Sequence, residues 1–338
     1  MSEVVRFTRE GEIGVITVAN PPVNALSQPV RAGLKAAVET GLADAAVQAM
    51  VLICDGATFI AGADIREFGK PLAEPSLVPV IDTMEGASKP IVAAIHGTAL
   101  GGGLEVALGC HYRVAMPSAR VGLPEVNLGL LPGAGGTQRL PRLVGAEKAL
   151  DLMVQGSHVP AAEAQQLGIL DELVEGDLKT GALAFARRVL AENRGVKRAS
   201  ERPVAPVAAD FFANYEAGIA RRLRGFKAPF HIIKAVEAAA TLPFAEGMQR
   251  EAKLFQELMS SSESRAQRHV FFAEREVAKV PGLPKDVAQR EIKSAAVIGA
   301  GTMGGGIAMN FANAGIPVTL LELNREALDR GLAVVRRN

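Results

Sequence analysis

The spacing of hydrophobic residues predicts alternating strands and helices over the first part of the chain. Residues 12–20 and 49–55 are short runs rich in Val and Ile, which are typical of strands, and the longer apolar run at 89–100 predicts another buried strand. Residues 28–44 carry apolar side chains at helical spacing, and the apolar stretch 101–110 also predicts a helix. Repeated strand and helix units of this kind indicate an α/β fold.

From about residue 140 the pattern becomes helical, and two polar connections interrupt it. Residues 194–210 are basic, contain prolines and hold few large apolar residues, and residues 281–293 form a second connection. The helical stretch 245–280 includes "FFAERE", which we expect to pack against the earlier part of the chain. The last residues predict a strand, a glycine turn, a helix and a second strand that ends at Glu322.

The glycine turn near the end of the sequence has the pattern of a dinucleotide site. It contains Gly299, Gly301 and Gly304, and Glu322 follows the second strand. Such glycines allow a tight turn, close approach of a pyrophosphate and close packing of helix on strand, while the acid binds a ribose hydroxyl. The sequence therefore predicts the opening βαβ unit of an NAD-binding domain. Because a full domain needs several more strands, we expect an incomplete NAD site and no dehydrogenase activity.

Composition excludes several functional classes. Hydrophobic residues make up 49% of the 338 residues, the formal net charge is +1, and there is no Trp. The chain thus offers no basic field for nucleic acid, and with aromatic residues at 4% it has little material for stacking on bases. His96 and Glu105 interrupt the most apolar stretch, which argues against a membrane span. Cys54 and Cys110 predict buried free thiols, no metal-ligand spacing is present, and we expect a soluble intracellular protein.

Two isolated carboxylates are the candidate catalytic groups. Glu105 sits in "GGGLEVALG" and Glu125 in "LPEVNLGLLPG", among apolar residues, glycines and prolines. Burying a carboxylate costs free energy, so a structural role for Glu105, beside a buried Arg or capping backbone groups, is an equal alternative. Two carboxylates that face one cleft cannot both ionise easily, and one can then act as acid while the other acts as base. That division suits adding water to a double bond or moving a proton between carbons.

The glycines before Glu105 fit the same chemistry. Proton transfer beside a thioester carbonyl builds negative charge on the oxygen, and backbone N–H groups at a helix N-terminus stabilise such charge. Gly101, Gly102 and Gly103 have no side chains to keep the oxygen away. A second N–H group can come from Ala63 in the loop "FIAGADI".

The stretches that carry these residues closely resemble the crotonase superfamily, in particular its enoyl-CoA hydratases. They are "IAGADI", "HGTALGGGLEVALGCHYRVA" and "GLPEVNLGLLPGAGGTQRLPRLVG". The later segments "FFAER" and "VIGAGTMGGGIA" resemble the peroxisomal-type multifunctional β-oxidation enzymes, in which a hydratase and isomerase unit precedes a 3-hydroxyacyl-CoA dehydrogenase. The resemblance covers nearly the whole chain. It implies a crotonase-type core of repeated ββα units with C-terminal helices, followed by the first βαβ unit of an incomplete Rossmann domain.

The resemblance divides the chain into three parts. Residues 1–197 match the enoyl-CoA hydratase/isomerase core, and residues 198–290 match a helical segment and linker that pack on it. Residues 291–338 match the start of the NAD-binding dehydrogenase domain.

The resemblance also implies roles for single residues. Glu105 and Glu125 match the pair that holds the water, in which the first helps to activate it and the second delivers the α-proton or moves a proton between the α and γ carbons. The backbone N–H groups of Ala63 and Gly102 match the oxyanion hole. The residues expected to contact the coenzyme A thioester are Ala61, Gly62, Asp64, Ile65, Arg66, Gly101, Pro132 and Gly133.

The activity implied by the resemblance is hydration of trans-2-enoyl-CoA to 3-hydroxyacyl-CoA in fatty-acid β-oxidation, with Δ3,Δ2-enoyl-CoA isomerase activity. This chemistry needs no cofactor, NAD belongs to a complete dehydrogenase domain, and the implied location is a bacterial cytoplasm or a eukaryotic peroxisome. An NAD-dependent dehydrogenase and a crotonase-fold binding module without chemistry are the alternatives. The residues leave self-association and acyl chain length open.

Other polar residues have structural interpretations. Asp64 and Glu67 fit a helix-capping pair, and Arg139 fits a partner for nearby backbone carbonyls. His96 fits a core histidine with satisfied hydrogen bonds, and His111 fits a packing or hydrogen-bonding role at a strand start.

Overall fold

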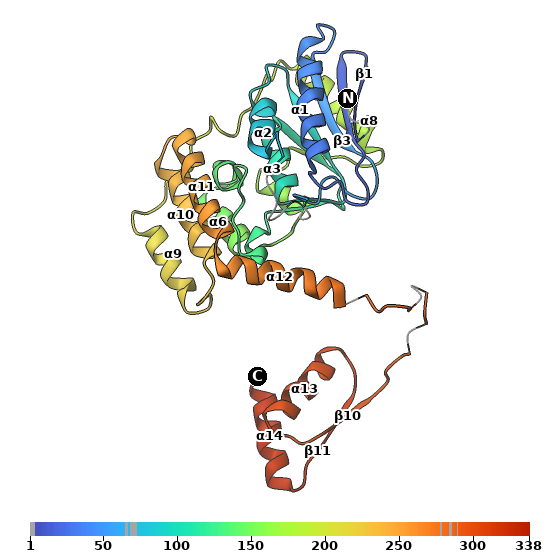
Figure 1. Cartoon of the computed structure of the whole chain (residues 1–338), viewed down its shortest axis with the longest axis vertical. Helices are drawn as coiled ribbons and strands as arrows, with labels where there is room; N and C mark the ends of the chain where they lie inside the picture. Colours follow the sequence, from blue (N-terminus) through green and yellow to red (C-terminus); the bar gives the residue numbers. More distant parts are fainter. Residues whose placement is uncertain (1–3, 65–66, 68–72, 278, 284–285, 289) are drawn as a thin grey trace. The chain divides into compact units, whose positions relative to one another are not determined.

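A computed structural model describes residues 4–64, 67, 73–277, 279–283, 286–288 and 290–338 (Figure 1). The chain divides into two units, Met1–Glu276 and Val277–Asn338. The boundaries expected from the sequence, which separate residues 1–197, 198–290 and 291–338, differ from this division and stay predictions.

A sheet of six strands supports the first unit. Its strands, in their spatial order, are β1 (Val5–Glu10), β2 (Ile13–Val18), β3 (Ala49–Cys54), β4 (Ile91–Ile95), β6 (Tyr112–Ala115) and β9 (Glu172–Leu173). All neighbours are parallel except β1 and β2, which pair antiparallel across a turn at Gly11. The strands predicted at 12–20 and 49–55 are confirmed as β2 and β3, and β1 adds an edge strand whose alternating pattern is too short and polar to stand out in the sequence.

Helices cover both faces of this sheet. They are α1 (Gln28–Ala43), α2 (Leu77–Glu85) and α3 (Gly102–Gly109) on one face and α8 (Leu178–Ala191) on the other. Neighbouring residues of β2 point to opposite faces, so that Ile16 joins the core beneath α1 and Val15 joins the core beneath α8. The helices predicted at 28–44 and 101–110 are confirmed as α1 and α3.

The single strand predicted at 89–100 is wrong, because the structure divides this run between two sheets. β4 belongs to the main sheet, whereas β5 (Thr98–Leu100) joins a three-stranded sheet with β7 (Arg120–Gly122) and β8 (Val159–Pro160). The break falls at Gly97, whose φ is +58°, and a Cβ there would lie 2.4 Å from the carbonyl oxygen of Ala57. Since β5 runs directly into α3, this turn sets where α3 begins.

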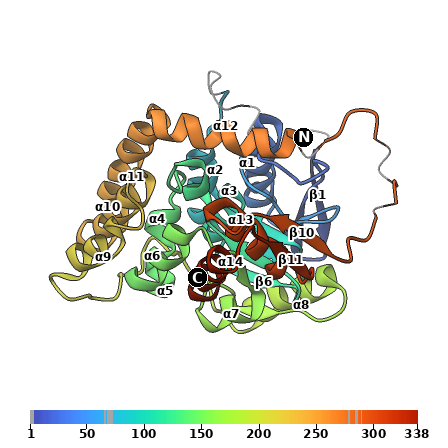
Figure 2. The same cartoon turned by 90° about the horizontal axis from the view of Figure 1, so that it is seen from below.

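Further helices of the first unit follow α3 along the chain. They are the 3-10 helix η2 (Glu125–Leu128), α4 (Gly136–Arg139), α5 (Pro141–Val144), α6 (Ala146–Gln155), α7 (Ala161–Gln166), α9 (Phe211–Ala220), α10 (Ala228–Thr241), α11 (Phe244–Met259) and α12 (Ser262–Val277). Figures 1 and 2 show α9, α10 and α11 packed against α4, α5 and α6, on the side away from β1. The helical prediction for 245–280 is confirmed over most of its length as two helices, because Ser260 is the C-cap of α11 and the Ser261 hydroxyl accepts the Ser264 N–H at the start of α12.

The second unit has the predicted strand–turn–helix–strand order. Its elements are β10 (Ala295–Ile298), α13 (Thr302–Asn313), β11 (Val318–Leu321) and α14 (Arg325–Arg337). β10 and β11 pair in parallel, with α13 as the connection between them. Among the described residues, no helix is long and apolar enough to cross a membrane.

Candidate active site

The glycines at the start of α3 have separate steric reasons. Gly101 has a φ of +53°, and a Cβ on it would lie 2.9 Å from the Oε1 atom of Glu125. A Cβ on Gly103 would lie 2.1 Å from the carbonyl oxygen of Ile60. A side chain at either position would displace the Glu125 carboxylate or the backbone at Ile60, so these glycines set the geometry around Glu105.

The structure brings the two predicted oxyanion donors together. Gly102 is the first residue of α3, so its N–H group has no acceptor within the helix. A Cβ on Gly102 would lie 3.7 Å from the backbone nitrogen of Ala63. A bridge between Leu26 and Ala63 fixes the loop, where the N–H of Leu26 donates to the carbonyl of Gly62. Two backbone N–H groups from separate segments thus lie near one another.

Glu105 is buried, and backbone amides contact it. Its Oε1 atom accepts hydrogen bonds from the N–H groups of Ala134, at 2.7 Å, and Gly136, at 2.8 Å. The structural alternative expected from the sequence is therefore correct in part, because Glu105 does satisfy backbone groups. Both bonds end on one oxygen, so these contacts are compatible with a chemical role for Oε2.

Glu125 begins η2 and is half-buried. Its Oε2 atom is buried and has no hydrogen-bond partner among the described residues, while its Oε1 atom lies against Gly101. α12 holds this turn from outside, since the Ser264 hydroxyl donates to the carbonyl of Leu128 and the Gln267 amide donates to that of Val126. A buried carboxylate oxygen without a partner is costly in a purely structural role, and it is suited to a substrate or water.

Burial alters the protonation of both carboxyls. Burial raises the pKa of Glu105, and the amides of Ala134 and Gly136 and the charge of Arg139 oppose the rise. Burial raises the pKa of Glu125 well above the usual range for glutamate, and the negative charge of Glu105 adds to the rise. The two groups cannot both carry full charge easily, which is the condition for an acid and base pair near neutral pH.

Another buried carboxylate near Glu105 is Glu251 on α11, which the sequence pattern did not indicate. Burial and the charge of Glu105 raise its pKa to about 8. It accepts hydrogen bonds from the backbone of Gly135 and from both the backbone and the hydroxyl of Thr137. The available signal was its spacing, because Glu251 falls on the same face of α11 as the buried Leu254 and Leu258.

The residues expected to contact coenzyme A are Gly101, at the N-cap of α3, and two further groups. The first group lies on the loop that begins at Ala61, where Ala61 is half-buried and Asp64 is buried. Gly62 in this loop has a φ of +127°, and a Cβ on it would lie 3.3 Å from the carbonyl oxygen of Leu100. Ile65 and Arg66 lie outside the described residues. The second group lies on the segment before α4, where a Cβ on Gly136 would lie 2.7 Å from Pro132 and 3.0 Å from the Oε1 atom of Glu105.

A Cβ on Gly133 would meet the ring of Phe255 at 2.5 Å. This places the second group next to Glu105 but leaves its contacts with coenzyme A a prediction. The segment before α4 therefore packs tightly on both sides, against α3 through Gly136 and against α11 through Gly133.

The structural interpretation of Arg139 is confirmed. Its guanidinium bonds the carbonyl of Ala134 at 3.2 Å and forms a buried ion pair with Glu85 at 2.8 Å. Glu67 does cap a helix, but the helix is α1, since it accepts the N–H of Gln28 and pairs with Arg31 at 2.8 Å.

The two histidines behave differently. His111 is fully buried between the N–H of Ile91 and the carbonyl of Glu85, which confirms a hydrogen-bonding role. His96 lies just beyond β4 and bonds the carbonyl of Gly56, but its buried Nδ1 atom has no partner among the described residues, so the prediction of full satisfaction is wrong.

In the second unit the predicted glycines surround a turn that fits a pyrophosphate. Gly299 has a φ of +99°, and a Cβ on Gly304 would lie 1.8 Å from the carbonyl oxygen of Gly299. A Cβ on Gly301 would meet nothing within 4 Å, so a ligand can approach its backbone. Glu322 follows β11, and its carboxylate accepts the N–H of Ala300 at 2.7 Å. These residues fit the adenosine side of NAD.

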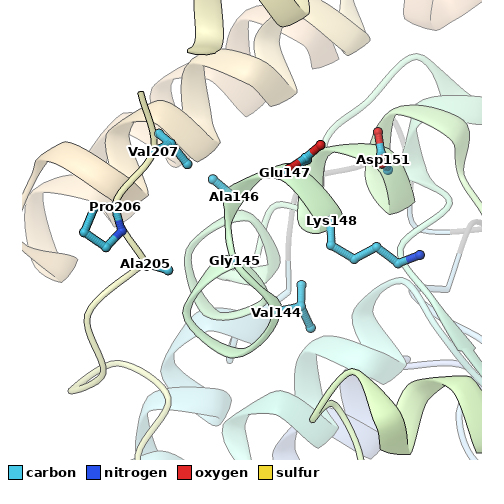
Figure 3. Close-up of a pocket in the computed structure, with 9 residues that line it drawn as sticks. All are labelled: Val144, Gly145, Ala146, Glu147, Lys148, Asp151, Ala205, Pro206 and Val207. Carbon is cyan, nitrogen blue, oxygen red and sulfur yellow. The ribbon is translucent and has the colours of Figure 1, made fainter. Parts of the chain in front are cut away.

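A surface pocket lies elsewhere in the first unit (Figure 3). Its lining residues are Val144, Gly145, Ala146, Glu147, Lys148, Asp151, Ala205, Pro206 and Val207. None of them is a residue predicted for the active site. The described residues also hold no group of three His, Cys, Asp or Glu side chains that could bind a metal ion.

Comparison with known proteins identifies the class of protein that this fold and site define. The model of the enoyl-CoA hydratase/isomerase family matches residues 8–231. A second model, that of the 3-hydroxyacyl-CoA dehydrogenase NAD-binding domain, matches residues 294–338. The chain belongs to the enoyl-CoA hydratase/isomerase family, and it also carries part of an NAD-binding domain.

Similar proteins point to a narrower group. The chain is 45% identical over 330 residues to the peroxisomal bifunctional enzyme of Danio rerio. The match covers 96% of this chain and 46% of that protein. It is 37% identical over 341 residues to a peroxisomal fatty acid beta-oxidation multifunctional protein of Arabidopsis thaliana, with 96% and 47% covered. The chain thus spans about half the length of the curated relatives it matches.

Solved structures share the fold of the first unit. A carnitinyl-CoA dehydratase from Mycobacterium avium is 28% identical with a TM-score of 0.60, covering 79% of this chain and 96% of that one. An enoyl-CoA hydratase from Bacillus anthracis is 25% identical with a TM-score of 0.53, covering 81% and 97%. The predicted fold class, a crotonase-type α/β core with C-terminal helices followed by a βαβ unit, is confirmed.

Proposed function

We propose that the first unit adds water to trans-2-enoyl-CoA thioesters in fatty-acid β-oxidation, using Glu105 and Glu125 as an acid and base pair. The observation that carries the proposal is that two carboxyls with raised pKa values, those of the buried Glu105 and the half-buried Glu125, lie together beside a pair of backbone N–H groups. Membership of the enoyl-CoA hydratase/isomerase family and the names of the relatives support the substrate class.

The proposed division of roles follows from the surroundings of each carboxyl. Glu105 is held through Oε1 by two amides, so its Oε2 atom can orient and activate the water. Glu125 has the more strongly raised pKa and can hold the proton that passes to the α-carbon. The N–H groups of Ala63 and Gly102 would stabilise the charge that develops on the thioester oxygen.

Isomerase activity on 3-enoyl-CoA is part of the same proposal. Moving a double bond by one position needs a base that removes a proton at one carbon and an acid that returns it at another, and one carboxyl can do both when it starts in its ionised form. The unpartnered Oε2 atom of Glu125 supports that role. A trans-3-enoyl-CoA should then gain the absorbance of a conjugated thioester before that absorbance decays by hydration.

We further propose that acyl-CoA is bound by the loop that begins at Ala61 and by the segment around Pro132 and Gly133. In the second unit, Gly299, Gly301, Gly304 and Glu322 would hold the pyrophosphate and a ribose of NAD, which when bound supplies hydride transfer. The compartment would be a peroxisome in a eukaryote, as the names of the relatives suggest, or the cytoplasm of a bacterium.

The test is the loss of enoyl-thioester absorbance when the chain meets crotonyl-CoA, run beside Glu125→Gln. Rapid loss with the parent and a fall of roughly 10²- to 10⁴-fold in the variant support hydration through the pair. A parent that binds coenzyme A but leaves crotonyl-CoA unchanged contradicts the proposal and favours a binding role. Reduction of NAD in the presence of a 3-hydroxyacyl-CoA separates this activity from a dehydrogenase.

A further inference from the structure

A buried carboxylate on a C-terminal helix reaches the segment that holds Glu105. Glu251 is only 1% exposed, and its Oε1 atom accepts the N–H of Gly135 at 2.7 Å. Its Oε2 atom accepts the N–H of Thr137 at 3.2 Å and the hydroxyl of Thr137 at 2.5 Å. Three donors from one short segment thus converge on one carboxylate, although Glu251 is more than a hundred residues away in sequence.

The same segment supplies the hydrogen bonds to Glu105. Four successive N–H groups alternate between the two carboxylates: those of Ala134 and Gly136 donate to Glu105, and those of Gly135 and Thr137 donate to Glu251. The segment therefore lies between α3 and α11 and is bonded to both. Any rotation of its peptide groups that loses one pair of bonds also disturbs the other pair.

Close packing leaves the segment little room to adjust. Gly135 has a φ of +97°, and a Cβ on it would lie 1.9 Å from the Nη1 atom of Arg139. The buried ion pair with Glu85 holds Arg139 in place. On the α11 side, the ring of Phe255 lies against Gly133. Glu251 is the group on α11 that fixes the direction of the amides.

We propose that Glu251 is a positioning residue for Glu105: it fixes the peptide groups of residues 134–137 and thereby the orientation of the Glu105 carboxylate. The inference deepens the proposed function and rests on it. Glu251 does not itself touch the reacting atoms in this account. Glu251 acts on Glu105 only through the peptide groups that donate to Glu105. Loss of the Glu251 carboxyl should therefore slow the chemical step more than it weakens substrate binding.

Three variants and one control separate positioning from simple support of the fold. Glu251→Gln keeps the size and one acceptor oxygen but turns an N–H₂ group toward a donor, and Glu251→Ala removes both oxygens. Thr137→Val removes the hydroxyl that donates to Glu251 and accepts the Gln138 amide, and it nearly keeps the shape of the side chain. Glu246→Gln makes the same substitution on an exposed position of α11 and is the matched control.

Each variant is assayed for kcat and KM with crotonyl-CoA, and for thermal unfolding. We expect kcat to fall about 100-fold in Glu251→Ala and roughly 10-fold in Glu251→Gln, because misplacing a catalytic group by about 1 Å costs that order of rate. The kcat of Thr137→Val should fall by a smaller factor. KM should stay within about threefold of the parent in all variants, and Glu246→Gln should match the parent.

The opposite pattern overturns the inference. If Glu251→Gln and Thr137→Val keep the parental kcat while their melting temperatures fall, Glu251 only supports the fold. A KM that rises with kcat unchanged would also overturn the inference, because it would assign Glu251 to substrate binding. Should Glu251→Ala fail to fold, these two milder variants decide the question. A parent inactive on crotonyl-CoA contradicts the hydratase proposal itself, an outcome distinct from an active parent whose Glu251 variants are unaffected.

Discussion

The starts of α3 and α13 use the same backbone device in two different units. Each helix follows a strand through a glycine at its N-cap, Gly101 for α3 and Gly301 for α13. Each has a glycine in its first turn whose Cβ would collide with a carbonyl oxygen, at 2.1 Å for Gly103 and 1.8 Å for Gly304. In both units the missing side chains let backbone N–H groups face an approaching oxygen.

The carboxylates beside these two helix starts differ in their surroundings. Burial raises the pKa of Glu105, whereas the N–H groups of Ala300 and Leu323 lower the pKa of the partly exposed Glu322. A glutamate with a raised pKa can exchange a proton near neutral pH, and one with a lowered pKa stays charged and only accepts hydrogen bonds. Under the proposed functions, the same glycine turn would bind an oxygen in either unit, and burial of the neighbouring carboxylate would decide whether proton chemistry accompanies it.

The largest expected effect distinguishes the two kinds of carboxylate directly. Glu125→Gln should lower kcat for crotonyl-CoA hydration by roughly 10²- to 10⁴-fold, because it removes the group proposed to hold the α-proton. Glu322→Gln, the same substitution in the second unit, should leave hydration unchanged. Stopped-flow absorbance of both variants checks this, and comparable loss in the two would break the distinction.

The next largest expected effect is the change in unfolding free energy when glycines of the first unit are replaced by alanine. Gly103→Ala should destabilise the first unit by about 1–3 kcal/mol and reduce hydration, since its Cβ would meet the backbone of Ile60. Gly218→Ala, in the interior of α9 with nothing within 4 Å of its Cβ, should instead stabilise by about 0.5–1 kcal/mol. Denaturant titration followed by kinetics measures both changes, and an unaffected Gly103→Ala would show that α3 can shift freely.

In the second unit Gly304 and Gly306 form a matched pair. A Cβ on Gly304 would meet the carbonyl of Gly299, whereas a Cβ on Gly306 would meet nothing within 4 Å. Gly304→Ala should therefore destabilise the unit, while Gly306→Ala should be neutral or slightly stabilising. Equal melting of the two variants would contradict the steric account of this turn, and hydration should be normal in both.

The pH response should also differ between the units. Burial lowers the pKa of His111 in the first unit to about 4, so the unfolded chain binds more protons than the folded one between pH 6.5 and 4. Stability is therefore full at higher pH, and about 2 kcal/mol should be lost between pH 7.5 and pH 5. His111→Asn should remove most of that dependence in denaturant titrations, and an unchanged slope would exclude His111 as its source.

The smallest expected effect concerns Glu322. Its pKa is lowered in the folded state, so its contribution to stability is present above the ordinary glutamate pKa and is lost as the pH falls through the lowered value. Glu322→Gln should flatten this acid-side dependence in the second unit and lower its stability at neutral pH by the small amount that the charged carboxylate contributes. Hydrogen exchange of the Ala300 amide with changing pH measures it.

The hydrophobic pattern was sufficient to predict elements whose burial follows one regular pattern from end to end. β3 and α1 follow directly from it, because a strand buried on both faces and an amphipathic helix leave distinct periods in the sequence. The run at 89–100 failed because both of its halves are apolar, and only the left-handed backbone at Gly97 separates them. The spacing of apolar residues does not show that β4 and β5 belong to different sheets.

The candidate site was predictable where a residue broke its own pattern. Glu105 and Glu125 stood out as lone carboxylates among apolar neighbours, and the glycines marked a helix start. Glu251 could not be predicted because α11 is rich in charged residues and one more carboxylate does not break its pattern. Its burial and its hydrogen bonds to Gly135 and Thr137 depend on the fold. Contacts between segments far apart in sequence require the fold.

The most direct test of the comparison measures which carboxyls hold a proton at neutral pH. Infrared difference spectra of the parent, Glu125→Gln and Glu322→Gln would report the carbonyl stretch of protonated carboxyl groups. Our account predicts such a band in the parent at pH 7, a weaker band in Glu125→Gln and an unchanged band in Glu322→Gln. A band of equal intensity in the parent and Glu125→Gln would contradict the claim that burial keeps the catalytic carboxyl protonated.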